Sequence, residues 1–200
     1  MENVYKNCPK YENENYILRM VRKEDKLDLL KVYSDKKAVV FMNSDNCGGD
    51  DFYYTTESRM EQAIDYRLFK YNREGFVRWT IISKTLKEAI GTIELFHRNA
   101  GDYFTNCGLL RMDIRSDHEI ASEIIKILGL IIEPAYTLFH CDKIATKAIP
   151  SATERITALN YLGFELIAEK LIGHDGTKYD SYFVLKQNRR NCSGLTGQGY

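Results

Sequence analysis

Histidine and cysteine are the residues of this chain with the most versatile chemistry, since they bind metals and act as nucleophiles or acid–base groups. The 200-residue sequence has four histidines and five cysteines, the latter being Cys8, Cys47, Cys107, Cys141 and Cys192. No two cysteines are spaced as Cys-x-x-Cys, and no histidine lies three to five residues from a cysteine. We therefore expect neither a structural zinc site nor a disulfide framework, and the free thiols favour a reducing, cytoplasmic compartment.

Two histidines lie at the ends of predicted elements, and histidine is a common acid–base group in proteins. His97 follows Phe96 at a strand end, where a hydrogen-bonded surface role is favoured over a catalytic one. His118 lies in the first turn of a long predicted helix. No histidine lies near Cys107 in the sequence, so we interpret this residue as a small buried side chain rather than a nucleophile.

The apolar pattern places these groups on a series of strands and helices. A period of two predicts strands, and apolar residues that recur every three or four positions predict helices. The predicted strands are 16–21, 77–83, 90–96, 107–114, 143–148, 164–172 and 179–185, and the predicted helices are 27–33, 38–42, 55–71, 117–139 and 152–162. We expect Pro134 to kink or interrupt the longest helix, because proline lacks the backbone N–H, and Gly163 to end the last one.

This order predicts an α/β (α+β mixed) fold in a single domain over residues 1–186, with a peripheral tail over 187–200. Tight turns favour a largely antiparallel sheet, and the β-α-β unit in the second half adds one parallel strand pair. We expect one core to contain eight residues from different elements: Trp79, Ile81, Ile93, Leu110, Ile125, Leu128, Ile144 and Phe164.

Charge and hydropathy exclude several classes of protein. The 28 lysines and arginines equal the 28 aspartates and glutamates in number, which argues against a nucleic-acid or membrane-surface partner. The N-terminal residues hold no apolar run of the kind found in a signal peptide. No apolar stretch approaches the roughly 20 residues that cross a bilayer.

Several short phrases occur in an order that resembles the GNAT superfamily of N-acetyltransferases, closest to the branch that modifies ribosomal-protein N-termini. The resemblance covers about residues 16–186. Its phrases are Leu18-Arg19, then Ser34-Asp35 after a helix, Trp79-Thr-Ile81, Ile90-Gly-Thr-Ile93, and a last helix that ends in Leu162-Gly163-Phe164.

The resemblance implies acetyl-CoA as co-substrate and no metal. GNAT proteins bind it in a V-shaped gap between two splayed parallel strands, here 107–114 and 143–148. The main chain of Met112, Asp113 and Ile114 is then expected to pair with the pantetheine arm. The pyrophosphate is expected at the start of the following helix, on Arg115, Ser116, Glu119, Ile120 and Ala121, because a helix N-terminus attracts anions.

The chain departs from the family pattern at this phosphate loop. Glu119 stands where the family has a glycine, and Ser116 stands at the basic position. Two interpretations remain open: a structural capping box, in which Ser116 and Glu119 cap the helix start, or a phosphate loop that works despite the change, with the help of Arg115.

The second cofactor motif departs as well. The family's asparagine falls on Ala152, and Ser151 with Glu154 forms a second Ser-x-x-Glu pattern. The family's general-acid tyrosine falls on Leu159. Tyr161 lies about 200° round the helix from that position, and we expect it to pack in the core.

The implied reaction is acetyl transfer to a primary amine of a small molecule or a peptide N-terminus. Glu94 and Asp113, on the central strands, are the candidate general bases. The acceptor is expected over residues 36–72, where Asp45, Asp50 and Asp51 form either a solvated acidic loop or a site for a cationic amine. An inactive GNAT-fold binding or sensing module with weakened acyl-CoA binding is the alternative function, and a monomer or a homodimer fits either.

Overall fold

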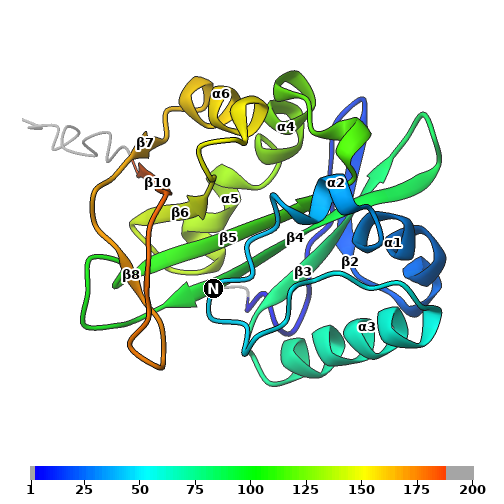
Figure 1. Cartoon of the computed structure of the whole chain (residues 1–200), viewed down its shortest axis with the longest axis horizontal. Helices are drawn as coiled ribbons and strands as arrows, with labels where there is room; N and C mark the ends of the chain where they lie inside the picture. Colours follow the sequence, from blue (N-terminus) through cyan, green and yellow to red (C-terminus); the bar gives the residue numbers. More distant parts are fainter. Residues whose placement is uncertain (1–2, 188–200) are drawn as a thin grey trace, which may run out of the picture.

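The computed structural model describes residues 3–187, so the predicted tail over 187–200, except Gln187, lies outside the described residues. The chain folds into a central sheet with helices on both faces (Figure 1). The strands are β1 Tyr11–Glu12, β2 Tyr16–Met20, β3 Val77–Ser83, β4 Glu88–Arg98, β5 Cys107–Ile114, β6 Lys143–Lys147, β7 Glu165–Leu166, β8 Leu171–Ile172, β9 Lys178–Tyr179 and β10 Tyr182–Lys186. The helices are α1 Lys26–Tyr33, α2 Lys36–Val39, α3 Glu57–Asn72, α4 Ala121–Leu128, α5 Ile132–Leu138 and α6 Thr153–Tyr161, with short 3-10 helices at Lys23–Asp25 and Ser116–His118.

The main sheet has eight strands in the order β1-β2-β3-β4-β5-β6-β10-β7. Its pairs are antiparallel except β5–β6, which is parallel. The predicted mixed fold with one parallel pair is therefore confirmed. β8 and β9 form a separate hairpin, so the predicted strand over 164–172 divides into two short strands that belong to different sheets.

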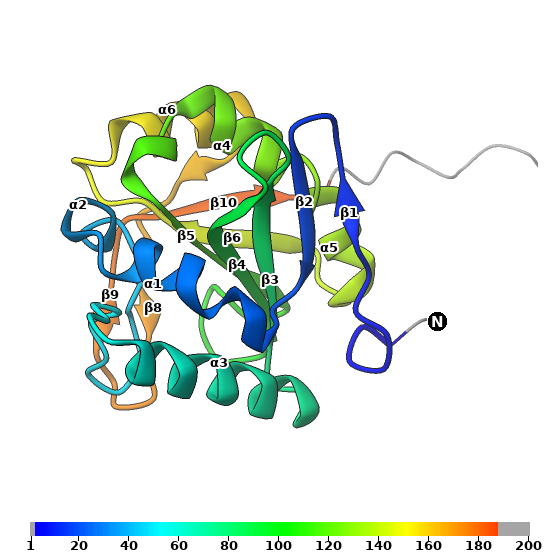
Figure 2. The same ribbon diagram turned by 90° about the vertical axis from the view of Figure 1, so that its right-hand side faces the viewer.

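Alternation along the strands sends two sets of side chains to opposite faces, because successive strand residues point to opposite sides. One face packs on α4, α5 and α6, and the other packs on α1 and α3 (Figure 2). Seven of the eight predicted core residues are buried in the first layer, and Ile125 is half-buried against it.

The helical segment predicted over 117–139 is interrupted, as one of the two expected outcomes, but the break lies before Pro134 rather than at it. It consists of a 3-10 turn, α4 and α5, with a break at residues 129–131 that precedes Pro134. Pro134 lies in the first turn of α5, where a backbone N–H has no helical partner to lose. Gly163 ends α6 with φ 85°, as predicted.

Gly91 lets β4 approach β5 closely at the end of β5. A Cβ atom built on Gly91 lies 2.3 Å from the Asp113 carbonyl oxygen and 2.9 Å from the Ile114 Cα, both of which are backbone atoms. No side chain can be placed there without moving one of the two strands.

We predict that Gly91→Ala lowers the free energy of unfolding by about 2–3 kcal/mol, because overpacking against backbone forces the strands apart. Gly101→Ala is the matched control, since its Cβ meets no atom within 4 Å, and it is expected to change stability by less than about 0.5 kcal/mol. Urea unfolding measures both. Equal effects of the two substitutions would contradict the close approach of β4 and β5.

Candidate functional site

The strands β5 and β6 separate halfway along β5. They pair only from Cys107 with Lys143 to Leu110 with Thr146, and β5 continues without β6 to Ile114. This splayed end, called here the β5–β6 gap, corresponds to the V-shaped space that the resemblance implies.

The side chain of Arg155, from α6, reaches the splayed end of β5 in the β5–β6 gap. Its Nη1 donates to the carbonyl oxygens of Met112 at 3.0 Å and Phe41 at 2.8 Å. Its Nε and Nη2 donate to the two carboxylate oxygens of Glu119, each at 2.7 Å. Both side chains are more than nine-tenths buried. The Met112 carbonyl, expected to pair with a pantetheine arm, is thus bonded to the protein itself.

The backbone N–H groups expected to hold a pyrophosphate also have partners within the protein. Five of the six N–H groups over residues 116–121 donate to a protein oxygen. The acceptors are the Asp35 carboxylate for Ser116, the carbonyls of Arg115, Ser116 and His118 for His118, Glu119 and Ile120, and the Glu154 carboxylate for Ala121. Carboxylates therefore occupy two of the positions at which an anion was expected.

The predicted capping boxes at Ser116 and Ser151 do not form. α4 begins after Ile120 and α6 begins after Ala152, both without a side-chain cap from the helix's own start. The reason is competition from distant partners, since Glu119 binds Arg155 and Glu154 binds the Ala121 N–H.

The other predicted cofactor residues differ in burial and in their hydrogen-bond partners. Met112, Asp113, Ile114 and Ala152 are buried, whereas Ile120 is 44% exposed. Two residues pair away from the gap. Arg115 bonds Glu88 and Asp117. His118 bonds Glu123 at 2.7 Å.

The predicted core position of Tyr161 is wrong. Its side chain is 76% exposed, whereas Leu159, which stands at the family's tyrosine position, is buried. No tyrosine of α6 therefore reaches the β5–β6 gap.

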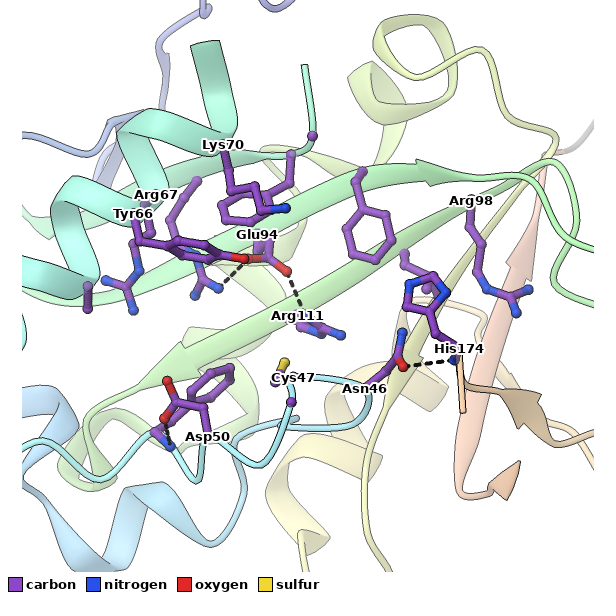
Figure 3. A pocket seen from close by; sticks show the side chains of 18 of the residues that line it. Asn46, Cys47, Asp50, Tyr66, Arg67, Lys70, Glu94, Arg98, Arg111 and His174 are labelled. Atoms are coloured by element: carbon purple, nitrogen blue, oxygen red, sulfur yellow. Dashed lines mark hydrogen bonds and ion pairs between the residues drawn. The ribbon is translucent and has the colours of Figure 1, made fainter. Parts of the chain in front are cut away.

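A cavity of about 840 Å³ opens on the face of the sheet that packs on α1 and α3. It lies between α3, the loop 46–54, the strands β3 to β5 and the β8–β9 hairpin. We call it the basic cavity, because its lining holds six lysines and arginines and two acids, namely Arg59, Arg67, Lys70, Arg78, Arg98 and Arg111 with Asp50 and Glu94. Figure 3 shows Arg67 and Lys70 on one side and Glu94 with Arg111 on the strands. Arg111 is also the first residue of β5 beyond its last pair with β6.

Glu94 lies in the floor of the basic cavity between two guanidinium groups. It forms an ion pair with Arg78 and accepts a hydrogen bond from Arg111 at 2.8 Å. Burial opposes ionisation of this carboxyl, but the charges of Arg78 and Arg111 outweigh it and hold its pKa below the usual range. A carboxylate with a lowered pKa is a weak proton acceptor.

Asp113 is fully buried and does not line the basic cavity. One of its oxygens, Oδ2, accepts hydrogen bonds from Tyr33 at 2.6 Å and from Arg78 at 2.7 Å. Burial raises the pKa of Tyr33 to about 12, so its hydroxyl stays protonated and acts as the donor. The two candidate bases thus meet at Arg78.

The acidic loop proposed as an amine site is used internally. Asp45 accepts from Lys147 at 2.7 Å and Asp50 accepts from Arg59 at 2.7 Å. Asp51 accepts from the backbone N–H of Tyr53. His97 is an exposed, hydrogen-bonded residue as expected, with Nδ1 at 2.6 Å from the Phe139 carbonyl oxygen.

Sequence reasoning missed the arginines that organise both sites, Arg67, Arg78 and Arg155. One signal was available for Arg78, because an arginine between Val77 and Trp79 in a strand must point to the face opposite those two apolar residues. Nothing local distinguishes Arg67 and Arg155 from surface arginines.

Two absences hold for residues 3–187. No cluster of three or more histidine, cysteine, aspartate or glutamate side chains in this part of the chain is arranged to hold a metal ion. None of the helices in it combines the length and the apolar character needed to cross a membrane.

Comparison with known proteins shows which fold this is. Neither a family model nor a curated protein matches the sequence. Solved structures do match. The GNAT-family acetyltransferase from Bacillus anthracis is 10% identical with a TM-score of 0.64, covering 89% of this chain and 98% of that one. The ribosomal-protein-S5-alanine acetyltransferase from Vibrio fischeri is 15% identical with a TM-score of 0.64, covering 88% and 94%.

A third match, Mycobacterium smegmatis RimJ in complex with CoA-disulfide, is 14% identical with a TM-score of 0.67, covering 89% of this chain and 86% of that one. The chain therefore has the fold of the GNAT acetyltransferases, as the resemblance implied. Ribosomal-protein acetyltransferases are among the structures that share this fold.

The ion pairs of Glu94 make a prediction about acid stability. Because its pKa is lowered by folding, Glu94 contributes stability that is fully present above its unfolded pKa of about 4.3 and is lost as the pH falls through its folded pKa. We predict that Glu94→Gln lowers the free energy of unfolding at pH 7 by about 3–5 kcal/mol, since a buried pair is broken.

The difference between Glu94→Gln and the wild type is expected to shrink as the pH is lowered below about 4. Urea unfolding between neutral and acid pH measures it. Glu165→Gln, at an exposed position, is the control and should follow the wild type at every pH. A difference that stays constant with pH would mean that Glu94 is not an ion in the folded protein.

Proposed function

We propose that this protein is an acyl-CoA-dependent N-acyltransferase that transfers an acetyl group to a primary amine of a small molecule or a peptide N-terminus. The observation that carries the proposal is the separation of β5 from β6 beside the basic cavity. An acyl donor in the gap and an acceptor in the cavity would both lie next to Arg111. The GNAT fold and the CoA complex of a structural neighbour support this proposal.

In the proposed reaction the amine nitrogen attacks the thioester carbonyl carbon, a C–N bond forms, and the C–S bond breaks. The sulfur leaves as the CoA thiolate, and the amine loses one proton. Of the two carboxylates proposed as base, Glu94 lines the cavity and Asp113 does not. Because the pKa of Glu94 is low, we assign it first to holding Arg78 and Arg111, and as a base it would act weakly.

The donor must displace Arg155 to enter the β5–β6 gap. Opening the gap separates Arg155 from Glu119 or moves the pair as a unit, and leaving one member of a buried pair without its partner costs about 3–5 kcal/mol. We therefore expect acyl-CoA to bind more weakly than in a fold with an open gap. The residues proposed to contact it are Met112, Asp113, Ile114, Arg115, Ser116, Ile120, Ala121 and Ala152, with Glu119 as an opposing charge.

A second candidate function, a binding module without acyl transfer, is favoured by one observation. The N–H groups over residues 116–121 are already bonded to protein oxygens, two of which belong to carboxylates. A pyrophosphate would lose these donors and meet negative charge.

Calorimetry with acetyl-CoA and a thiol-release assay with a panel of amines separate the two functions. We predict weak, measurable acetyl-CoA binding, because the pyrophosphate must displace protein oxygens from the N–H groups over residues 116–121. We also predict amine-dependent release of free CoA. No binding of acetyl-CoA at millimolar concentration would exclude acyl transfer and leave the binding module.

We predict that Glu119→Gly changes affinity and stability in opposite directions. Removing the carboxylate frees Arg155 as a cation next to the pyrophosphate, so the affinity for acetyl-CoA should rise about tenfold at low salt. The melting temperature without ligand should fall, because Arg155 loses its bidentate partner.

Two matched variants test whether opening the gap is the cause. Asp117→Gly removes an acid from the same loop that is 60% exposed and bonded to Arg115, so its effect on affinity should be much smaller. Arg155→Gln should lower the melting temperature without raising affinity, since it leaves Glu119 buried and charged. If Asp117→Gly and Glu119→Gly raise affinity equally, the Arg155–Glu119 pair does not control the gap.

A further inference from the structure

The α3 side of the basic cavity presents two cations that form no ion pair in the described part of the chain. Arg67 and Lys70 stand one turn apart on α3, and both line the cavity (Figure 3). Neither has an ion pair within residues 3–187. Arg67 is 4% exposed, and its Nη1 is buried without a hydrogen-bond acceptor in that part of the chain.

The other cations of the cavity are matched by carboxylates. Arg59 pairs with Asp50, Arg98 pairs with Asp102, and Arg78 and Arg111 share Glu94 and Asp113. The positive excess of the basic cavity therefore comes from Arg67 and Lys70, at one defined place.

The surroundings of Arg67 hold its guanidinium in position. The group lies over the ring of Tyr33, with 4.5 Å between its central carbon and the ring centroid. Stacking on an aromatic face leaves the planar edge of a guanidinium free to donate two parallel hydrogen bonds to an oxyanion. A buried guanidinium without an acceptor is unfavourable, and a bound oxyanion removes that penalty.

The rest of the lining suits an organic ligand rather than an inorganic ion alone. The volume of about 840 Å³ is within the range of small-molecule sites. Aromatic side chains contribute much of the wall, namely Phe52, Tyr54, Tyr66, Phe76 and Phe96. Such rings favour a planar or apolar part of a ligand.

We infer that the basic cavity binds a small molecule that carries a carboxylate or phosphate group, with the oxyanion on Arg67 and Lys70 and the remainder against the aromatic walls. One consequence rests on the proposed function. If the protein is an acyltransferase, its acceptor is an amine that also carries a carboxylate or phosphate group. Its amine would lie toward the cavity floor, near Arg111, where β5 leaves β6.

The test uses four probes that share a phenyl ring: benzoate, phenyl phosphate, benzamide and benzylamine. They are titrated into the full chain by calorimetry at low salt, without acyl-CoA. We expect both anions to bind and the neutral and cationic probes to bind at least about tenfold more weakly, since charge-assisted hydrogen bonds are lost. The ratio of the two anions distinguishes a carboxylate ligand from a phosphate ligand.

Substitutions locate the binding. Arg67→Gln should weaken the better anion about tenfold or more, and Lys70→Gln about threefold, whereas Arg73→Gln should leave it unchanged. Arg73 is an exposed arginine at the end of the same helix, outside the cavity. Because Arg67 packs on Tyr33, its variant is checked by urea unfolding, and Lys70→Gln provides the test if Arg67→Gln does not fold.

Three results would overturn the inference: no binding of either anion at millimolar concentration, equal binding of benzamide, or an Arg73→Gln effect as large as that of Lys70→Gln. The outcome is independent of acyl transfer, because no donor is present. Anion binding in a protein that does not turn over acetyl-CoA would keep this inference and reject the acyltransferase. Turnover of acetyl-CoA without anion binding would keep the acyltransferase and reject this inference.

Discussion

The architecture around both sites depends on one buried charge, that of Arg78. A guanidinium with 3% exposure must be neutralised where it lies, since removing a charge from water without a partner is very costly. Two acids do so, Glu94 from the neighbouring strand and Asp113 from the strand beyond it. Arg78 Nη1 also donates to the hydroxyls of Thr92 and Tyr33, the latter from α1. Three strands and a helix are thereby fixed around the cavity floor.

A second buried arginine pair, Arg155 with Glu119, lies at the splayed end of β5. Arg155 and Glu119 join α6 to the loop before α4 and to the Met112 carbonyl. The same strand therefore has an accessible cavity on one face and, at its splayed end, a carbonyl that is already bonded to the protein. In energetic terms, the ligand of the cavity meets preformed charges, whereas a ligand of the gap must first displace a pair that is bonded to backbone and side chain.

Period-two and helical patterns were sufficient to predict the central strands, the parallel pair and most of the core, because apolar burial is encoded by spacing within a segment. The side chains of the gap were not predictable in this way. Ser116 and Ser151 with their glutamates match the local capping pattern, yet Glu119 binds Arg155, 36 positions away, and Glu154 binds the Ala121 N–H, 33 positions away. A local sequence pattern shows which nearby groups a glutamate could bond, but not whether a distant residue binds it more strongly. Pro134 shows a related limit, since a kink and an interruption were both compatible with its sequence, and the structure has a break with Pro134 in the first turn of the new helix.

The equal numbers of acidic and basic residues conceal a separation of charge within the domain. Carboxylates of Asp35, Glu119 and Glu154 surround the start of α4, while uncompensated cations lie at Arg67 and Lys70. An anion is thus disfavoured where the fold commonly accepts one and favoured on the other face, although both regions belong to a chain of zero formal charge. Ligand choice in this protein follows from these local fields, because Coulomb interactions at contact distance within a partly buried site far exceed the screened effect of net charge.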